Sequence, residues 1–316
     1  MTLITDKKIE KALIYRNNIW NKNNLIPTWV NLKTVDLDRF FTRKDVAEKC
    51  LNSLISILNL KKEKISNYKF IEPSAGDGAF FNLLPKKKRI GIDLVPSSNE
   101  IIQKDFLSWQ PKKNGHHYIT IGNPPFGYRA WLALSFLNHA AKFSEYVGFI
   151  LPMYFQSEGK GSSKHRVKGL ELIHSEVLPQ DSFIDPNGKV IKINALWQIW
   201  KRGTNKIKKQ KECSNWIDLF TVDYRKERLC GQKRIHEADF FLQRTFFKEQ
   251  PKLVKSFSEV KYVCGYGLVF KKEKRKILKI LNNTDWSKYS NLAAHNCRHI
   301  SMEHIKKTIT DAGFAD

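Results

Sequence analysis

The stretch YKFIEPSAGDGAFFNLL, residues 68–84, decides the fold because it joins an apolar run to a glycine-containing loop and a second apolar run. The residues up to Ile71 predict a buried strand, and those after Gly78 predict a short helix. Gly76 and Gly78 let the backbone turn sharply and approach a ligand closely. This order of strand, loop and helix predicts a ligand site at the carboxyl end of the strand.

The sequence that follows alternates in the same way between apolar strands and helices. Four further strands are predicted at residues 89–94, 101–107, 117–122 and 146–152, with a helix at residues 130–143. Such alternation is typical of a parallel sheet that is covered on both faces. Residues 189–202 alternate at period two, which predicts a later antiparallel pair or an edge strand. We therefore expect an α/β fold with a doubly wound, Rossmann-like sheet that is mostly parallel and has an antiparallel edge.

A helix is also predicted before the first strand. Its apolar face is formed at helical spacing by Val46, Cys50, Leu51, Leu54, Ile55 and Leu58. Thr42 is a candidate cap, with Asp45 three positions later as in a capping box. Residues 1–38 are polar and asparagine-rich, and we expect an N-terminal arm that is partly helical.

The composition indicates an anionic partner. The chain of 316 residues has a formal net charge of +24, and residues 201–316 hold 26 Lys and Arg against 13 Asp and Glu. Such an excess favours nucleic acid or an anionic membrane surface, although a lysine-rich bias of the genome contributes to it. No apolar run reaches the roughly 20 residues of a membrane span, and the N-terminus lacks the apolar core of a secretory signal. The five cysteines form no Cys-x-x-Cys pair, which suits reduced thiols in a cytoplasm.

The change of composition near Gly203 predicts three parts of the chain. We expect an arm at residues 1–38, a catalytic domain at residues 39–204 and a basic C-terminal target-recognition region at residues 205–316. The C-terminal part contains the basic stretches 223–234 and 271–276. The alternative for the second stretch is a solvated helix face. Residues 153–167 form a polar loop that either contacts a nucleic-acid backbone or is a surface loop.

Acidic residues stand at three successive strand tips. Glu72 ends the first strand, Asp93 ends the second, and Asp105 with Phe106 ends the third. An acid about 20 residues after a glycine loop can hold both hydroxyls of a ribose. Asp105 could accept a hydrogen bond from an exocyclic amine, and Phe106 could stack on an adenine ring. The alternatives are a tight Gly-Asp-Gly turn, helix caps and salt bridges.

The fourth strand runs into Asn-Pro-Pro-Phe, residues 123–126. Neither proline has an N–H for a strand ladder, so the chain must leave the sheet here. The Asn123 side-chain oxygen and the Pro124 carbonyl can accept two hydrogen bonds from an amine, and the prolines hold these acceptors in place. Phe126 can stack on a base. The alternative is a rigid turn without a chemical role.

These motifs together resemble the S-adenosylmethionine-dependent amino-methyltransferases that act on adenine in DNA. The resemblance covers residues 39–202 and includes Glu-Pro-x-x-Gly-x-Gly-x-Phe, residues 72–80, and Asn-Pro-Pro-Phe. The stretch FFTRKDVA, residues 40–47, resembles the segment that closes over the methionine end of the cofactor, and its position is that of the gamma subgroup. The resemblance implies a methyltransferase sheet. It implies cofactor contacts at Phe41, Thr42, Glu72, Pro73, Ser74, Ala75, Gly76, Asp77, Gly78, Asp93, Leu94, Asp105, Phe106 and Asn123, and catalytic roles for Asn123, Pro124, Pro125 and Phe126.

The resemblance also implies the reaction and the partners. We expect methyl transfer from S-adenosylmethionine to the N6 amine of an adenine that is flipped out of double-stranded DNA. The methyl donor is already activated, so we expect no metal ion, and the absence of a Pro-Cys dipeptide removes the nucleophile of the cytosine C5 route. His295, Cys297, His299 and His304 fit no standard zinc spacing, and Arg298 is a candidate DNA contact.

Three biological readings stay open at this point. The enzyme could belong to a restriction–modification system, with a cognate nuclease, or be a solitary bacterial or phage enzyme of the cytoplasm. The same Asn-Pro-Pro-Phe chemistry would serve an RNA adenine or protein-glutamine methyltransferase. A third reading is a non-catalytic nucleic-acid-binding subunit on this scaffold.

Overall fold

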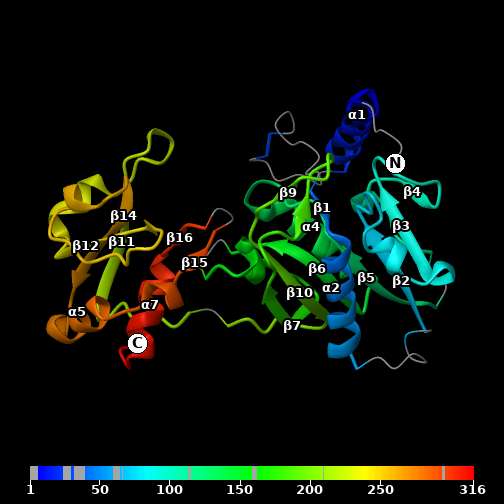
Figure 1. Cartoon of the computed structure of the whole chain (residues 1–316). Helices are drawn as coiled ribbons and strands as arrows, with labels where there is room; N and C mark the ends of the chain where they lie inside the picture. The colour runs from blue at the N-terminus through cyan, green and yellow to red at the C-terminus, as the bar shows by residue number, and fades with distance from the viewer. Residues whose placement is uncertain are drawn as a thin grey trace. The chain divides into compact units, whose positions relative to one another are not determined.

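The computed structural model describes residues 6–23, 30–31, 40–59, 65, 67–112, 115–158, 162–208, 210–293 and 296–316. The chain divides into two compact units (Figure 1). Unit 1 comprises residues 1–155 and 166–207, and unit 2 comprises residues 156–165 and 208–316. Residues 156–165 thus belong to unit 2 although they lie inside the range expected for the catalytic domain, and the N-terminal residues belong to unit 1.

Unit 1 contains a seven-stranded sheet with the order β4-β3-β2-β5-β6-β10-β7. Its strands are β2 (Tyr68–Pro73), β3 (Arg89–Asp93), β4 (Ile101–Gln103), β5 (His117–Gly122), β6 (Tyr146–Pro152), β7 (Leu170–Val177) and β10 (Ala195–Arg202). The five strands from β4 to β6 are parallel to their neighbours, whereas β10 is antiparallel to both β6 and β7. The predicted α/β fold with a mostly parallel, Rossmann-like sheet is therefore confirmed.

The chain order reverses between β2 and β5. From β2 the sheet extends through β3 and β4 on one side and through β5 and β6 on the other. Loops at the carboxyl ends of the strands diverge at such a switch point and leave a crevice between them, where ligands bind in open α/β sheets. The loop after Pro73 and the loop after Gly122 both start at this crevice.

The antiparallel part of the sheet is larger than a single edge strand. Residues 195–202 form β10, which lies between β6 and β7, so that β7 occupies the edge. The side chains of Trp197 and Trp200 are fully buried on β10. A strand in this position is covered on both faces, which explains why five of its first six residues are apolar.

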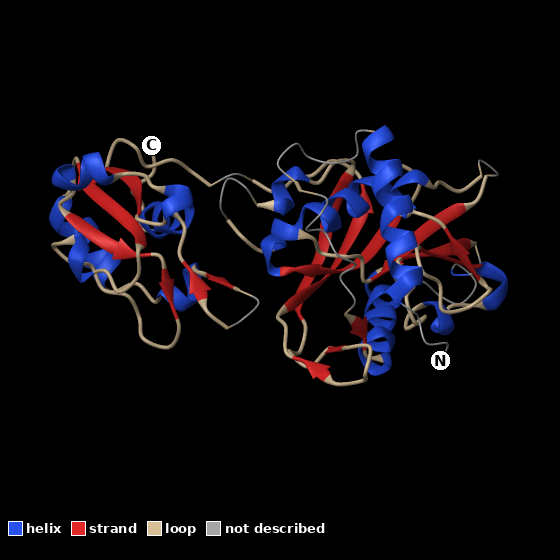
Figure 2. Cartoon of the chain, turned by 90° about the horizontal axis from the view of Figure 1, so that it is seen from above, coloured by secondary structure: helices blue, strands red, loops and turns tan. Residues whose placement is uncertain are grey.

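Helices, blue in Figure 2, pack on the faces of the sheet, which is red. The apolar side of α2 (Lys44–Ile57) packs into a core cluster with Phe70, Ile121 and Ile150. Because side chains alternate along a strand, Phe149 and Leu151 point to the opposite face of β6. There α4 (Trp131–Ala140) packs against β6. The predicted helices are thus present, except that the short helix after Gly78 is a 3-10 turn, Phe81–Leu83.

Thr42 does not cap α2, so the capping-box prediction is wrong. The N-cap residue is Arg43, and no side chain caps this helix end. Thr42 instead lies in β1 (Phe41–Thr42), where it pairs with Phe183 of β8 (Phe183–Ile184). Asp45 forms an ion pair with Arg43 at 3.1 Å. The strand pairing with a distant segment therefore overrides the local capping signal.

The N-terminal part contains a helix, as expected for residues 1–38. Residues 6–22 form α1 (Asp6–Lys22), which buries Ala12, Arg16 and Trp20. Trp29 lies outside the described residues, as do most of residues 24–39. Among the described helices, none is long and apolar enough to cross a membrane.

Unit 2 is built on a three-stranded antiparallel sheet of β11 (Ile217–Asp223), β14 (Cys264–Phe270) and β12 (Phe240–Gln243). A second small sheet joins β13 (Thr245–Phe246), β16 (Arg298–His299) and β15 (Asn291–Leu292). The helices are α5 (Lys274–Asn282), α6 (Trp286–Tyr289) and α7 (Met302–Asp311). Their apolar sides share one core with the first sheet, including Leu268, Ile277 and Ile305. This core makes unit 2 a folded module in its own right.

Candidate active site

A cavity of about 760 Å³ in unit 1 lies at the carboxyl ends of the parallel strands. The sequence-predicted residues that line it are Phe41, Ser74, Gly76, Asp77, Asp93, Leu94, Asp105, Phe106, Asn123 and Pro125. They come from the tips of β2, β3, β4 and β5 and from β1. The structure therefore brings together the acids of two strand tips and the asparagine of a third.

The glycine loop is held to the tip of β3. The backbone N–H of Gly76 donates to Asp93 Oδ2 at 2.8 Å, and the N–H of Val95 donates to Oδ1 at 2.7 Å. Gly76 has a φ of +51°, and a Cβ atom there would lie 3.3 Å from the Phe41 ring. Glycine is thus required both by the backbone conformation and by the close approach of β1. These bonds fix the Asp93 carboxylate at the cavity wall.

Asp105 and Phe106 are more deeply placed than their neighbours. Asp105 is 1% exposed and accepts a hydrogen bond from the N–H of Ser108 at 3.1 Å. Burial raises the pKa of Asp105, and nearby N–H donors partly offset this effect. The Phe106 ring packs against Phe136 and His139 with centroids about 5 Å apart. An acceptor and an aromatic side chain thus face the same end of the cavity.

Five predicted contact residues do not line the cavity, namely Thr42, Glu72, Pro73, Ala75 and Gly78. Glu72 is buried below the glycine loop, where a Cβ atom at Gly122 would lie 3.2 Å from its Cγ. Burial raises the pKa of Glu72 well above its usual value. Hydrogen bonds from the backbone N–H groups of Phe81 and Phe80 lower the pKa, but by less. Glu72 Oε2 and Thr42 Oγ1 are buried without a hydrogen-bond partner. Each therefore adds an unsatisfied buried polar atom to unit 1.

Glu72→Gln is expected to change how stability depends on pH. The folded state keeps a proton on Glu72 at pH values where the unfolded chain has released it, so wild-type stability falls as the pH rises from about 4.5 toward the raised pKa. Glutamine does not titrate and lacks this loss. Urea denaturation over a pH series should show the free energy of unfolding of the variant rising relative to wild type as the pH increases above about 4.5. Glu48→Gln, on the exposed side of α2, is the control, and a pH-independent difference for Glu72→Gln would contradict the assignment.

Asn123 is oriented by a contact that sequence reasoning did not anticipate. Its Nδ2 donates to the main-chain oxygen of Phe40 at 3.2 Å. Only the nitrogen of the amide can donate to a carbonyl, so this bond determines which way the amide faces. Asn123 Oδ1 is then left buried without a hydrogen-bond partner. A buried acceptor without a partner is costly, which makes this atom a candidate for ligand binding.

A second, much smaller pocket adjoins the cavity at Asn123. Its lining consists of Phe40, Asn123, Pro124, Pro125, Phe126, Phe183 and Ile193. Asn123, Phe40 and Pro125 belong to both pockets. All four residues predicted as catalytic therefore line the small pocket, and Asn123 lies where the two pockets meet.

The chain after Phe126 is strained. Gly127, Arg129 and Ala130 have φ values of +67°, +54° and +61°. Gly127 adopts such a value readily, whereas at Arg129 and Ala130 it costs of order 1–2 kcal/mol each. This sharp reversal starts α4 directly behind the Asn-Pro-Pro-Phe segment. Leu132 and Phe136 of α4 consequently line the cavity.

The sequence prediction missed the contribution of α1 to the cavity. Ile9, Arg16 and Trp20 of α1 line it, together with Lys44, Asn82, Ile92, Val95, Ser97, Ser98, Lys104, Leu132, Phe136, Pro186 and Asn187. The spacing of Ile9, Arg16 and Trp20 places them on one side of a helix. That spacing was the available signal. A search for apolar residues alone at helical spacing misses it, because one of the three residues is Arg16.

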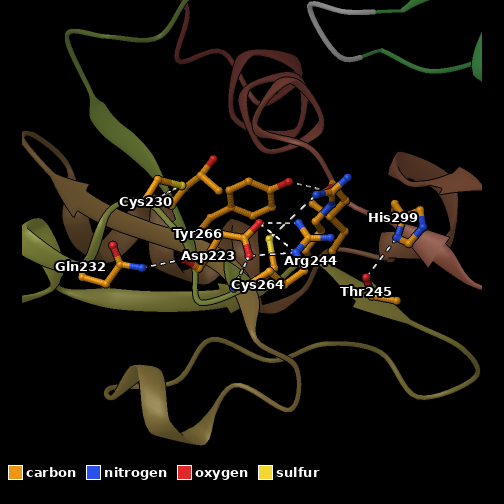
Figure 3. A network of polar contacts seen from close by, with 11 residues as sticks. Asp223, Cys230, Gln232, Arg244, Thr245, Cys264, Tyr266 and His299 are labelled. Carbon is orange, nitrogen blue, oxygen red and sulfur yellow. Dashed lines mark hydrogen bonds and ion pairs between the residues drawn. The ribbon is translucent and has the colours of Figure 1, made fainter. Parts of the chain in front are cut away.

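Unit 2 contains a network of polar contacts near the ends of β11 and β14 (Figure 3). Hydrogen bonds from Arg225 lower the pKa of Asp223 to about 2. Arg244 Nη1 donates to Cys264 Sγ at 3.9 Å, and the Tyr266 hydroxyl donates to the Ile300 carbonyl at 2.8 Å. Arg225, in the basic stretch 223–234, thus forms an ion pair with Asp223 inside unit 2.

The polar loop at residues 153–167 is not uniformly exposed. Ser162, Ser163 and Lys164 are buried, and Lys164 Nζ forms an ion pair with Glu158 at 2.6 Å. Residues 159–161 lie outside the described part of the chain. The described end of this loop is therefore packed, and contact of the loop with a nucleic-acid backbone stays a prediction.

Comparisons with known proteins were made on sequence and on structure. No family model and no curated protein matches the chain. Solved structures that resemble it include the 23S rRNA methyltransferase ErmE, with 13% identity, 54% of this chain and 72% of that chain covered, and a TM-score of 0.38. The magnesium protoporphyrin IX methyltransferase ChlM from Synechocystis PCC 6803, with bound S-adenosylmethionine, has 10% identity, coverages of 64% and 100%, and a TM-score of 0.36. A methyltransferase from Leishmania major has 15% identity, coverages of 61% and 83%, and a TM-score of 0.33.

Proposed function

We propose that the protein is an S-adenosylmethionine-dependent methyltransferase that methylates the N6 amine of a flipped-out adenine in double-stranded DNA. The observation that carries this proposal is Asn123 Oδ1, a buried acceptor without a hydrogen-bond partner. Asn123 stands at the tip of β5 and on the wall of a cavity that Asp93 and Asp105 also line. The enzyme would act in the cytoplasm, in a restriction–modification system or as a solitary bacterial or phage enzyme.

The residues of the cavity fit the cofactor. Asp93 keeps acceptor capacity for ribose hydroxyls while it binds the N–H groups of Gly76 and Val95, since a carboxylate offers about four lone pairs. Asp105 would accept from the adenine amine, and Asp77 would face the ammonium group. When bound, S-adenosylmethionine supplies a methyl group that its sulfonium already activates for transfer.

The Asn-Pro-Pro-Phe segment would hold the target base. The lone pair of an exocyclic amine is delocalised into the ring, so the amine must become pyramidal as the methyl group arrives. Asn123 Oδ1 and the Pro124 carbonyl oxygen would accept hydrogen bonds from the two N–H groups of the amine. These bonds would localise the lone pair on its nitrogen. The bond from Asn123 Nδ2 to Phe40 positions the side chain before the substrate arrives. Flipping the base costs a few kcal/mol, which contacts in this pocket would offset.

Nucleic-acid binding would rest on cations that are free of internal partners. On and beside α5, Lys272, Arg275 and Lys279 are exposed and form no ion pair among the described residues. Lys274 and Lys276, in contrast, pair with Asp239 and Glu273. We propose that the unpaired cations contact phosphates, which gives affinity without reading sequence.

Replacing Lys272, Arg275 and Lys279 together by alanine should weaken DNA binding and its salt dependence. Three lost phosphate contacts reduce the slope of log K against log salt concentration by about three. Fluorescence anisotropy with a labelled duplex, measured over a salt series, gives this slope. The matched control replaces Lys86, Lys87 and Lys88. They precede β3, at the amino-terminal end of the parallel strands, whereas the cavity lies at the carboxyl ends. An equal change of slope in both triple variants would contradict a specific role for α5.

The substrate is tested by parallel transfer of labelled methyl groups to duplex DNA, RNA and protein. Incorporation into DNA at N6 of adenine supports the proposal, and methylation-sensitive sequencing of a host that expresses the protein would give the recognition sequence. Incorporation only into RNA or into protein glutamine would show that the proposed substrate is wrong and would leave the proposed methyl-transfer chemistry in place. Binding of DNA without any transfer would identify a non-catalytic subunit.

A further inference from the structure

Helix α1 forms one wall of the cavity beside Asp105. Trp20 is 1% exposed, and its ring is held from two directions. The Trp131 ring meets it edge-on at a centroid distance of 5.5 Å, and the Arg16 guanidinium lies 4.6 Å from its centroid. A ring packed in this way has little freedom to turn, so the direction of its indole N–H is fixed.

The indole N–H of Trp20 is a buried donor without a hydrogen-bond partner of ordinary geometry. A weak hydrogen bond from this N–H to the Asp105 carboxyl lowers the pKa of that group, although burial has the larger, opposite effect. The cavity wall therefore presents an acceptor, Asp105, beside a donor, Trp20.

This pair complements one edge of an adenine. The exocyclic amine of adenine is a donor, and the ring nitrogens on either side of it, N1 and N7, are acceptors. A carboxylate beside an N–H group can therefore bind the amine and one of these nitrogens together. A buried N–H whose hydrogen bond has poor geometry is costly to the protein, and the ring nitrogen would give it a better acceptor.

We infer that Trp20 belongs to the cofactor site and donates a hydrogen bond to the adenine ring nitrogen next to the amine that Asp105 accepts. The inference rests on the proposed function, because it requires an adenosine cofactor in this cavity. It makes α1, which lies outside the stretch of sequence that resembles the methyltransferases, part of cofactor recognition.

The test is calorimetric binding of S-adenosylhomocysteine to wild type and to two matched variants. Trp20→Phe removes the N–H and should weaken binding about fivefold to tenfold. Trp131→Phe makes the same change on the neighbouring ring, which is 2% exposed, also has an unpartnered N–H, and does not line the cavity. It should leave affinity within about twofold. Equal effects of the two variants would assign the loss to packing and overturn the inference.

A second measurement compares three compounds on the wild-type protein, with Trp20→Phe as the control. The 1-deaza and 7-deaza analogues of S-adenosylhomocysteine each replace one candidate acceptor nitrogen by C–H. One of them should bind about fivefold to tenfold more weakly than the parent compound, and Trp20→Phe should bind that analogue and the parent equally. Equal binding of all three compounds by wild type would overturn the role of Trp20 alone. No binding of the parent compound by wild type would overturn the cofactor proposal itself.

Discussion

Asn123→Ala is expected to reduce methyl transfer by at least about 10²-fold, because it removes one of the two acceptors proposed for the target amine. The affinity for S-adenosylhomocysteine should stay within about threefold of wild type, since the proposed contacts of Asn123 are made mainly with the target. Single-turnover transfer of labelled methyl groups measures the first quantity, and calorimetry measures the second. A fall in rate without a fall in cofactor affinity places the loss in the chemical step.

The control for this variant is Asn52→Ala, which removes an exposed amide on α2 that does not line the cavity. It should leave both quantities unchanged. A second comparison is Asn123→Asp, whose carboxylate cannot donate to the Phe40 carbonyl and should turn away from it. Transfer by Asn123→Ala at a rate close to wild type would remove the amide from the mechanism.

Asp93→Ala is expected to lower cofactor affinity about 10²-fold or more. The carboxylate is proposed to accept two hydrogen bonds from ribose, and each charge-assisted bond contributes about 1.5–3 kcal/mol. The change also leaves the N–H groups of Gly76 and Val95 without their acceptor, so thermal stability should fall as well. Calorimetry with S-adenosylhomocysteine and thermal denaturation measure the two effects.

Asp45→Ala serves as the matched control, because it removes an exposed carboxylate that pairs with Arg43 and does not line the cavity. Asp93→Asn separates the two consequences of the loss at position 93, since an amide oxygen can still accept from one of the two backbone N–H groups. It should recover part of the stability while affinity remains low. A folded Asp93→Ala protein that binds the cofactor as wild type does would show that the ribose lies elsewhere.

The sheet and the meeting of its strand tips could be predicted from the sequence. Alternating apolar strands and helices indicate a parallel sheet, and in such a sheet all carboxyl ends lie at one edge. Asp93, Asp105 and Asn123 each follow a strand, so their presence at one cavity follows from topology. The prediction needed no knowledge of side-chain packing, which explains its accuracy.

The predictions that were wrong or absent depend on contacts between distant segments. Thr42 fits a helix cap and a strand equally well, and its pairing with Phe183 decided between them. Trp20 lines the cavity because α1 packs against Trp131. The spacing of Ile9, Arg16 and Trp20 indicates one side of a helix, but it does not indicate what that side packs against. Glu72 ends its strand as expected, but the 3-10 turn that begins at Phe81 covers it, so it lies below the cavity.

The short strand β1 has a consequence for how this site can vary. Phe40 contacts Asn123 through its carbonyl oxygen, and the next residue, Phe41, sets its ring beside Gly76. A shift of the main chain at Phe40 and Phe41 would weaken the bond that orients the Asn123 amide and would move the Phe41 ring away from Gly76 at the same time. We therefore expect substitutions at Phe40 or Phe41 to change the proposed methyl transfer and cofactor affinity together, not one without the other.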